Sequence, residues 1–165
     1  MKTLLALRNF AFGLATCSAL LLGSMEPARA QDDGKGGAYW VSTSKDKANM
    51  RVGPGRDYRI TWTYMRKGVP LKVLRVIDSW RLVEDKDGAR GWILQQFLNR
   101  ERAGIVTGSI TGLRANKDGS GRVLWRVAPG VIGKLGECGA GWCAFDIDGR
   151  KGFIRAASVW GADKP

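Results

Sequence analysis

The chain of 165 residues matches itself at an almost constant offset of 61–63 positions, and this internal repeat limits the folds open to it. The matching segments are Met50-Arg51 with Leu113-Arg114, Gly68 with Gly130, Trp80 with Trp142, Asp87-Gly88 with Asp148-Gly149, Arg90-Gly91-Trp92-Ile93 with Lys151-Gly152-Phe153-Ile154, and Phe97-Leu98 with Val159-Trp160. Because the offset barely changes, few insertions separate the two copies. The sequence therefore predicts two small units of the same fold in tandem.

The hydrophobic residues within each copy follow the period of β-strands. Residues 60–65 and 69–74 alternate as expected for strands that are buried on one face. Turn signals such as Gly53-Pro54-Gly55, Asp87-Gly88 and Asp148-Gly149 separate these runs, and Asp-Gly favours a hairpin whose turn residues both have positive φ. No stretch after residue 30 shows helical periodicity long enough for a helix. Each copy is therefore expected to form a small all-β barrel of about five strands.

Residues 1–30 have the features of a cleaved signal peptide. Lys2 and Arg8 give a positive start, the run Phe10–Gly23 is apolar and uncharged, and Ala28-Arg29-Ala30 supplies the small residues of a cleavage site. The apolar run is shorter than the roughly twenty residues that a membrane-spanning helix needs. We expect cleavage after Ala30 and a periplasmic or secreted protein with no stable membrane insertion, although a retained anchor remains an alternative.

The cysteines divide into one in the leader and a close pair near the C-terminus. Cys17 follows a segment that loosely resembles a lipobox, so a lipoprotein is a second alternative to simple cleavage. After cleavage only Cys138 and Cys143 remain, and two nearby cysteines in an exported protein predict a disulfide. The chain contains no histidine, and two thiols alone do not complete a zinc site, so we expect no metal and no cofactor.

The chain is strongly basic, with a formal net charge of +12. Removal of the leader leaves 24 basic and 14 acidic residues. For an exported protein the available polyanions are lipid head groups, lipopolysaccharide phosphates and the carboxylates of peptidoglycan, rather than nucleic acid. A generic basic surface that aids solubility is the alternative interpretation.

Several motifs, in the same order in both copies, resemble the bacterial SH3 domain. The first copy carries Asn49-Met50-Arg51-Val52-Gly53-Pro54-Gly55, Tyr58, Gly68, Trp80-Arg81-Leu82-Val83 and Gly91-Trp92-Ile93, and the second carries Leu113-Arg114, Pro129-Gly130-Val131, Trp142-Cys143, Gly152-Phe153-Ile154 and Trp160-Gly161. The resemblance covers nearly all of residues 39–161. It implies two tandem SH3-like β-barrels and a binding module, since such domains commonly bind cell-wall peptides or target wall hydrolases.

These patterns predict the organisation of the whole chain. We expect a signal peptide at 1–30, a mobile lead-in at 31–38, a first SH3-like domain at 39–98, a linker at 99–109 and a second SH3-like domain at 110–161.

Strand parity places two tryptophans on the outside of the barrels. If Val83 and Phe145 fill the interiors, then Trp80 and Trp142 point to the opposite face. We expect an aromatic ligand shelf there, which Tyr58 and Trp62 could extend in the first copy. Packing of the tryptophans under a loop or between the copies is the alternative. Trp92 and Trp125 are instead expected in the cores.

The first copy departs from SH3 domains that bind polyproline peptides. Leu94 and Phe97 stand where that class has a groove proline and tyrosine, and the loop that is acidic in that class carries Arg51, Arg56 and Arg59 here. The ligand is therefore expected to be an acidic peptide or one with a free carboxylate, bound by Arg51. Alternatively, Arg51 braces the barrel through backbone carbonyls.

Catalysis is not expected. The absence of histidine excludes Ser–His–Asp and Cys–His arrangements. The acidic cluster at 84–87 and the pair Asp146 and Asp148 flank Asp-Gly turns and are expected to be solvated hairpin tips. The sequence thus favours an exported binding module for peptidoglycan or a peptide, with a structural or scaffolding partner as the alternative; it does not indicate an oligomeric state.

Overall fold

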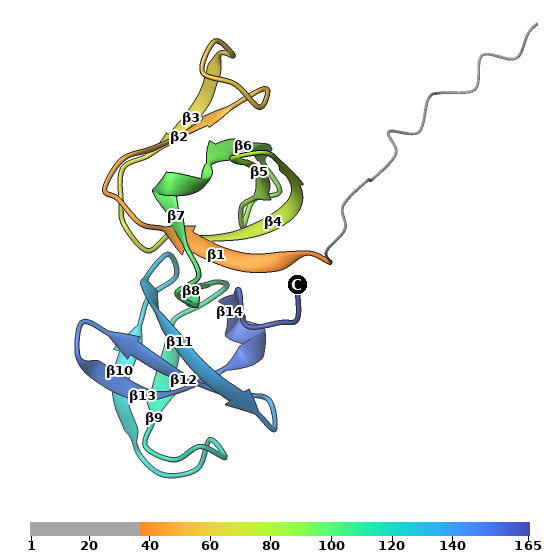
Figure 1. Ribbon diagram of the computed structural model, residues 1–165. Coiled ribbons are helices and arrows are strands. Elements are labelled where there is room, and N and C mark those ends of the chain that lie inside the picture. Colours follow the sequence, from red (N-terminus) through yellow and green to blue (C-terminus); the bar gives the residue numbers. More distant parts are fainter. Residues whose placement is uncertain (1–36) are drawn as a thin grey trace, which may run out of the picture. The chain divides into compact units, whose positions relative to one another are not determined.

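The structure, a computed structural model, describes residues 37–165. The expected signal peptide and most of the lead-in lie outside the described residues. Within them the fold is all-β, with two seven-stranded antiparallel sheets and no α-helix, which confirms the predicted fold class. Each sheet curls into a small barrel (Figure 1).

The first barrel is formed by seven strands and one short helical turn. These are β1 (Tyr39–Thr43), β2 (Ala48–Arg51), β3 (Ile60–Tyr64), β4 (Pro70–Ile77), β5 (Trp80–Glu84), β6 (Arg90–Leu94), the 3-10 helix η1 (Gln95–Phe97) and β7 (Leu98–Asn99). The strand order is β3-β2-β6-β5-β4-β1-β7, so β3 is an outermost strand.

The second barrel repeats this arrangement strand for strand. It contains β8 (Ala103–Val106), β9 (Thr111–Arg114), β10 (Val123–Val127), β11 (Ile132–Gly139), β12 (Trp142–Ile147), β13 (Arg150–Arg155), the 3-10 helix η2 (Ala156–Ser158) and β14 (Val159–Trp160). Its order is β10-β9-β13-β12-β11-β8-β14, and β10 takes the outermost place of β3.

The stretch 99–109, expected as a linker, contains strand β8. This strand pairs with β11 and β14, and all four of its residues are buried. Only residues 100–102 lie between β7 and β8. The sequence analysis missed β8 because the strand has four residues and lacks the alternation expected when one face is exposed.

The two cores use different residues to fill the same space. Val83 and Phe145 occupy equivalent positions on β5 and β12, and both are buried as predicted. The first barrel packs the paired Val41 and Leu71 near the small Val83. The second barrel has the pair Gly104 and Gly133 at those positions, and a Cβ on Gly133 would lie 2.8 Å from the Phe145 ring. The large ring thus replaces the volume that the two glycines remove.

The predicted disulfide is present in the second barrel. Cys138 on β11 and Cys143 on β12 are direct cross-strand partners, with a sulfur–sulfur distance of 2.01 Å. The first barrel has Val76 and Arg81 as the equivalent cross-strand pair. Between β12 and β13, Asp148 and Gly149 both have positive φ, at 49° and 88°, as the hairpin signal predicts.

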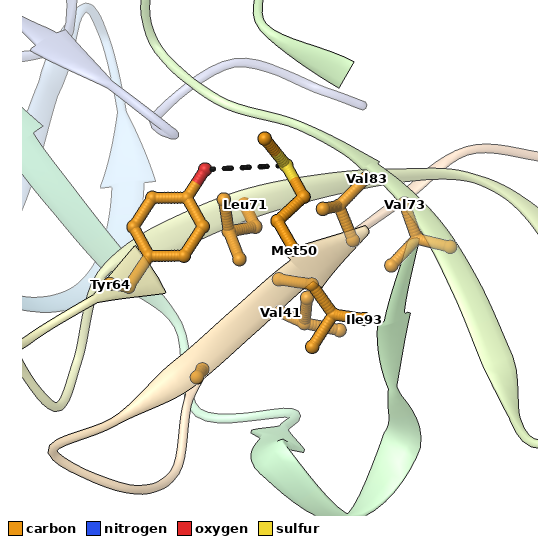
Figure 2. Packing of buried hydrophobic residues seen from close by; sticks show 8 residues of the cluster. Val41, Met50, Tyr64, Leu71, Val73, Val83 and Ile93 are labelled. Atoms are coloured by element: carbon orange, nitrogen blue, oxygen red, sulfur yellow. Dashed lines mark hydrogen bonds between the residues drawn. The ribbon is translucent and has the colours of Figure 1, made fainter. Parts of the chain in front are cut away.

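A buried tyrosine links the first core to the adjacent β5–β6 turn. The Tyr64 hydroxyl lies 3.7 Å from Met50 Sδ within the core (Figure 2) and 3.1 Å from Asp85 Oδ2. Burial raises the pKa of the Tyr64 hydroxyl far above its ordinary value of 10.0, and the negative charge of Asp85 and the hydrogen bond to it raise it further.

This shifted pKa predicts a loss of stability at high pH. As the pH rises above 10.0, the ordinary tyrosine pKa, the unfolded chain releases the Tyr64 proton while the folded chain keeps it. The free energy of unfolding therefore falls with pH, with a slope of up to about 1.4 kcal/mol per pH unit from this group. In Tyr64→Phe this contribution is absent, and denaturant unfolding between pH 9 and 11 should show a shallower decline. Equal slopes for the two proteins would refute the assignment.

The two barrels belong to one compact unit. Trp40 of β1, which is 6 % exposed, packs edge-on against Trp160 of β14 with ring centroids 4.6 Å apart. The Trp40 indole Nε1 donates a hydrogen bond to the Asp163 carbonyl at 3.0 Å. The aromatic contact that ties the two barrels together therefore involves this pair, rather than Trp80 and Trp142.

Candidate functional site

A groove on the first barrel brings together basic, aromatic and apolar side chains. One part of it is a cavity of about 240 Å³ lined by Asn49, Arg51, Arg56, Trp80, Leu94, Gln96 and Phe97. A second, shallower hollow continues from it and shares Arg56, Trp80, Leu94 and Gln96. The lining residues come from β2, the loop after β2, β5, β6 and η1, so this groove is a property of the folded barrel rather than of one segment.

Backbone pairing fixes Trp80 at one side of the groove. Trp80 begins β5 after a turn in which Asp78 has φ of 47°, and it pairs with Ile77 and Leu94. The amide of Gln95 donates to the Ser79 carbonyl at 2.8 Å, which joins the start of η1 to the same turn. The Trp80 side chain remains half-buried, with Val83 pointing the opposite way into the core.

Arg51 lines the groove, but it also braces the loop that follows β2. Its Nη1 donates to the Tyr58 carbonyl at 2.6 Å. Arg114, the equivalent residue of the second barrel, makes the same contact with the Gly121 carbonyl at 3.1 Å. The duplicated bond indicates a structural role for this arginine in both copies, which was the alternative interpretation of Arg51.

Arg56 is the groove arginine that the sequence analysis did not single out. It lines both parts of the groove beside Trp80, and its side chain is exposed. Among the residues that the structure describes, Arg56 forms no salt bridge. The reversed charge of the loop includes Arg56, but the sequence alone does not indicate which of its arginines lies beside the tryptophan.

Tyr58 and Trp62 lie outside the groove. The Tyr58 ring packs on the loop glycines, and a Cβ on Gly53 would lie 2.5 Å from it, so the ring fixes the loop that carries Arg56. Trp62 is 59 % exposed on the outermost strand β3. The structure thus brings Arg51 and Trp80 together and leaves these two aromatic residues elsewhere.

The equivalent position of the second barrel is filled by the chain itself. Gly119, which corresponds to Arg56 at an offset of 63, has φ of 78°, and a Cβ on it would lie 2.0 Å from the Trp142 ring. The Arg155 guanidinium lies 5.3 Å from the centre of the same ring. Trp142 therefore packs under its own loop, which was the alternative to a ligand shelf.

Hydrogen bonds within this second loop keep it over Trp142. The amide of Gly119 donates to the Asn116 carbonyl at 3.0 Å, and Asn116 Nδ2 donates to Ser120 Oγ at 2.9 Å. Hydrogen bonding from Ser120 lowers the pKa of the Asp118 carboxyl. These bonds stabilise a loop conformation in which Gly119 lies directly against the Trp142 ring.

Trp92 and Trp125 differ in burial. Trp92 is 8 % exposed, as expected of a core residue, but the expectation that Trp125 is also in a core is wrong, because it is 46 % exposed. Trp125 lies on the outermost strand β10, where the Arg150 guanidinium is 5.5 Å from its ring centre. Its side chain therefore lies at the edge of the sheet, where no neighbouring strand of the described residues covers it.

The acidic residues near the Asp-Gly turns are engaged in the turns themselves. Asp85 Oδ1 accepts hydrogen bonds from the amides of Asp87 and Ala89, at 3.0 Å and 2.9 Å. Asp146 Oδ1 accepts one from the amide of Gly149 at 2.7 Å. Over the described part of the chain there is also no cluster of potential metal ligands, and no helix long and apolar enough to cross a membrane.

Both barrels match one protein family. The model of the bacterial SH3 domain matches residues 44–99 and again residues 110–161, which is one match for each barrel. The chain belongs to the bacterial SH3 domain family. Domains of this family are typically binding modules, and the groove of this bacterial SH3 protein is formed on the first of its two matched regions.

Comparisons with individual proteins add little to the family assignment. No curated protein matches this bacterial SH3 protein. Among solved structures, NlpC1 from Trichomonas vaginalis is 10 % identical with a TM-score of 0.35 over 78 % of this chain, and NlpC2 from the same organism is 9 % identical with a TM-score of 0.35 over 74 %. The chain spans about half the length of each, as 48 % of both is covered. Likeness at this level carries no argument about function.

Proposed function

We propose that this chain is an exported, non-catalytic binding protein whose first barrel binds a carboxylate-bearing ligand of the cell envelope, either peptidoglycan or an acidic peptide. The observation that carries the proposal is the open groove in which Arg56 and Arg51 lie with Trp80. The family assignment agrees with a binding role, and the ligand class follows from the chemistry of the groove.

The groove offers separate groups for the charged and the apolar parts of a ligand. The Arg56 guanidinium can bind a carboxylate with two parallel hydrogen bonds. The Asn49 amide oxygen already accepts a hydrogen bond from Thr63 at 3.0 Å, so its amide nitrogen is left as a further donor. Trp80, together with Leu94 and Phe97, provides an apolar surface for the rest of the ligand.

A ligand with a free carboxylate suits this groove better than a polyproline peptide does. Leu94 and Phe97 line it without the tyrosine hydroxyl that a polyproline groove uses, and its loop is basic rather than acidic. The second barrel is expected to contribute little, because the Trp142 position is closed by Gly119. Its disulfide and glycine-based packing suit a supporting unit.

Export supports an envelope ligand. The first thirty residues have the pattern of a cleaved signal peptide, and a disulfide such as Cys138–Cys143 persists in an oxidising compartment. In that compartment peptidoglycan carries the abundant carboxylates. The location is therefore proposed as periplasmic or secreted.

Sedimentation with purified peptidoglycan tests the proposal. The unsubstituted chain is expected to pellet with the insoluble wall, and Trp80→Ala is expected to bind about 30-fold more weakly, since loss of a central tryptophan in a binding site costs about 2 kcal/mol or more. The bound fraction is measured as a function of wall concentration.

Trp142→Ala is the matched control, because it removes the equivalent tryptophan from the closed site, and its wall binding should stay within about twofold of that of the unsubstituted chain. Equal losses in both variants would place the site outside the first groove. No binding of the unsubstituted chain would remove the wall-binding proposal and favour the scaffolding alternative.

A further inference from the structure

The two outermost strands β3 and β10 expose the same kind of apolar residues. Trp62 and Trp125 occupy equivalent positions, at 59 % and 46 % exposure, and each follows a β-branched residue two positions earlier that is 41 % exposed, Ile60 and Val123. The groove uses neither strand. The four side chains therefore stay more than 40 % exposed at the same site of both barrels, although the Arg150 guanidinium lies near the Trp125 ring.

The segments that carry these residues are basic in both barrels. Residues 51–67 contain five basic residues against the single acidic Asp57, and two of the five, Arg51 and Arg56, also line the groove. The equivalent residues 114–130 contain four against the single acidic Asp118. Arg59 and Arg122 are exposed at equivalent positions, and the carbonyl of each accepts a backbone hydrogen bond at 3.1 Å, from Val52 and Ala115 respectively. Figure 1 shows the two hairpins, β2–β3 in the first barrel and β9–β10 in the second. Each combines exposed apolar residues with an excess of basic residues.

We propose that the β2–β3 and β9–β10 hairpins each form a peripheral binding surface for membranes that contain anionic phospholipids. The charge of both hairpins is complementary to such a surface, where each basic residue near the head groups strengthens binding about fivefold. Tryptophan is the side chain that favours the boundary between head groups and acyl chains, because its ring is apolar and its indole N–H can remain hydrated.

Three exposed non-aromatic residues near the hairpins favour lipid over a soluble polyanion. Val52, directly after β2, is 50 % exposed, and Met65, directly after β3, is 71 % exposed. Ile110, directly before β9, is 64 % exposed. Aliphatic side chains have no π-face on which a base or a sugar could stack, but they gain by entering the apolar boundary of a bilayer.

Vesicle sedimentation tests this surface separately from the peptidoglycan groove. The full chain lacking residues 1–30 is mixed with vesicles of phosphatidylcholine alone or of phosphatidylcholine and phosphatidylglycerol in equal amounts. We expect binding to the anionic vesicles only, at least tenfold weaker in the double variant Trp62→Ala with Trp125→Ala. The double variant Arg59→Glu with Arg122→Glu should weaken binding by a similar or larger factor.

Val76→Ala is the matched control, because Val76 is 45 % exposed on β4 and lies outside both hairpins, and its vesicle binding should be unchanged. Near-ultraviolet circular dichroism checks that each variant is folded. Absence of binding to the anionic vesicles overturns the proposal, as does binding that the tryptophan double variant leaves unchanged, since charge attraction alone would then account for it. Neither result bears on the groove, whose residues are not altered.

Discussion

Replacement of Trp40 by alanine is expected to lower the free energy of unfolding by about 3–5 kcal/mol, the usual cost of removing a buried tryptophan. The side chain is 6 % exposed, packs edge-on against Trp160 and donates a hydrogen bond to the Asp163 carbonyl. Its loss would leave a cavity where β1 meets β14 and would leave the Asp163 carbonyl without its partner. The midpoint of thermal unfolding should fall by roughly 15 °C.

The loss of stability in Trp40→Ala is compared with that of an exposed tryptophan, and the number of unfolding transitions shows whether the two barrels unfold together. Trp62→Ala removes the same side chain from an exposed position and should change the free energy of unfolding by about 0.5 kcal/mol or less. Calorimetry of the unsubstituted chain should show one transition, because the two barrels belong to one compact unit. If Trp40→Ala unfolded at the same temperature as the unsubstituted chain, the Trp40–Trp160 contact would have no stabilising role.

Arg56→Glu is expected to weaken binding to peptidoglycan by about 100-fold or more. Charge-assisted hydrogen bonds to a carboxylate contribute about 1.5–3 kcal/mol, and a glutamate in their place would repel the ligand. Arg56 is exposed and lines both parts of the groove, so the substitution should leave the stability of the barrel nearly unchanged. Binding is measured by sedimentation with the purified wall.

The matched control for Arg56→Glu is Lys117→Glu, which makes the same change in net charge on the exposed loop of the second barrel. Its binding should fall by no more than the effect of overall charge, about twofold at physiological salt. Arg56→Lys keeps the charge without the planar guanidinium and should lie between the unsubstituted chain and Arg56→Glu. Equal losses for Arg56→Glu and Lys117→Glu would mean that net charge, rather than this groove, holds the chain on the wall.

Most of the fold can be predicted from the sequence, because the same pattern of strands and turns occurs in both copies of the repeat. The burial of Val83 and Phe145 and the left-handed turn at Asp148-Gly149 follow from alternation and turn chemistry. The Cys138–Cys143 bond follows from the close cysteine pair and the export that the sequence predicts. Strand β8 was missed because a short strand buried along its whole length shows no alternation.

The candidate site was less predictable, because it depends on contacts between segments that are distant in sequence. Alternation places Trp80 and Trp142 on the outer face, but it does not show that Gly119 closes over Trp142. The charge of the first loop includes Arg56, but only the path of the loop shows that this residue lies beside Trp80. Trp125 has the periodicity of a core residue, yet it lies exposed on a strand at the edge of the sheet.

The most direct test of the central claim is a calorimetric titration with a synthetic peptidoglycan stem peptide and with the same peptide after amidation of every carboxylate. Binding through Arg56 predicts that the free-carboxylate peptide binds at least about tenfold more tightly than the amide, and that this preference disappears in Arg56→Glu. Equal affinities for the two peptides, or tighter binding of a proline-rich peptide, would contradict a carboxylate-binding groove on the first barrel.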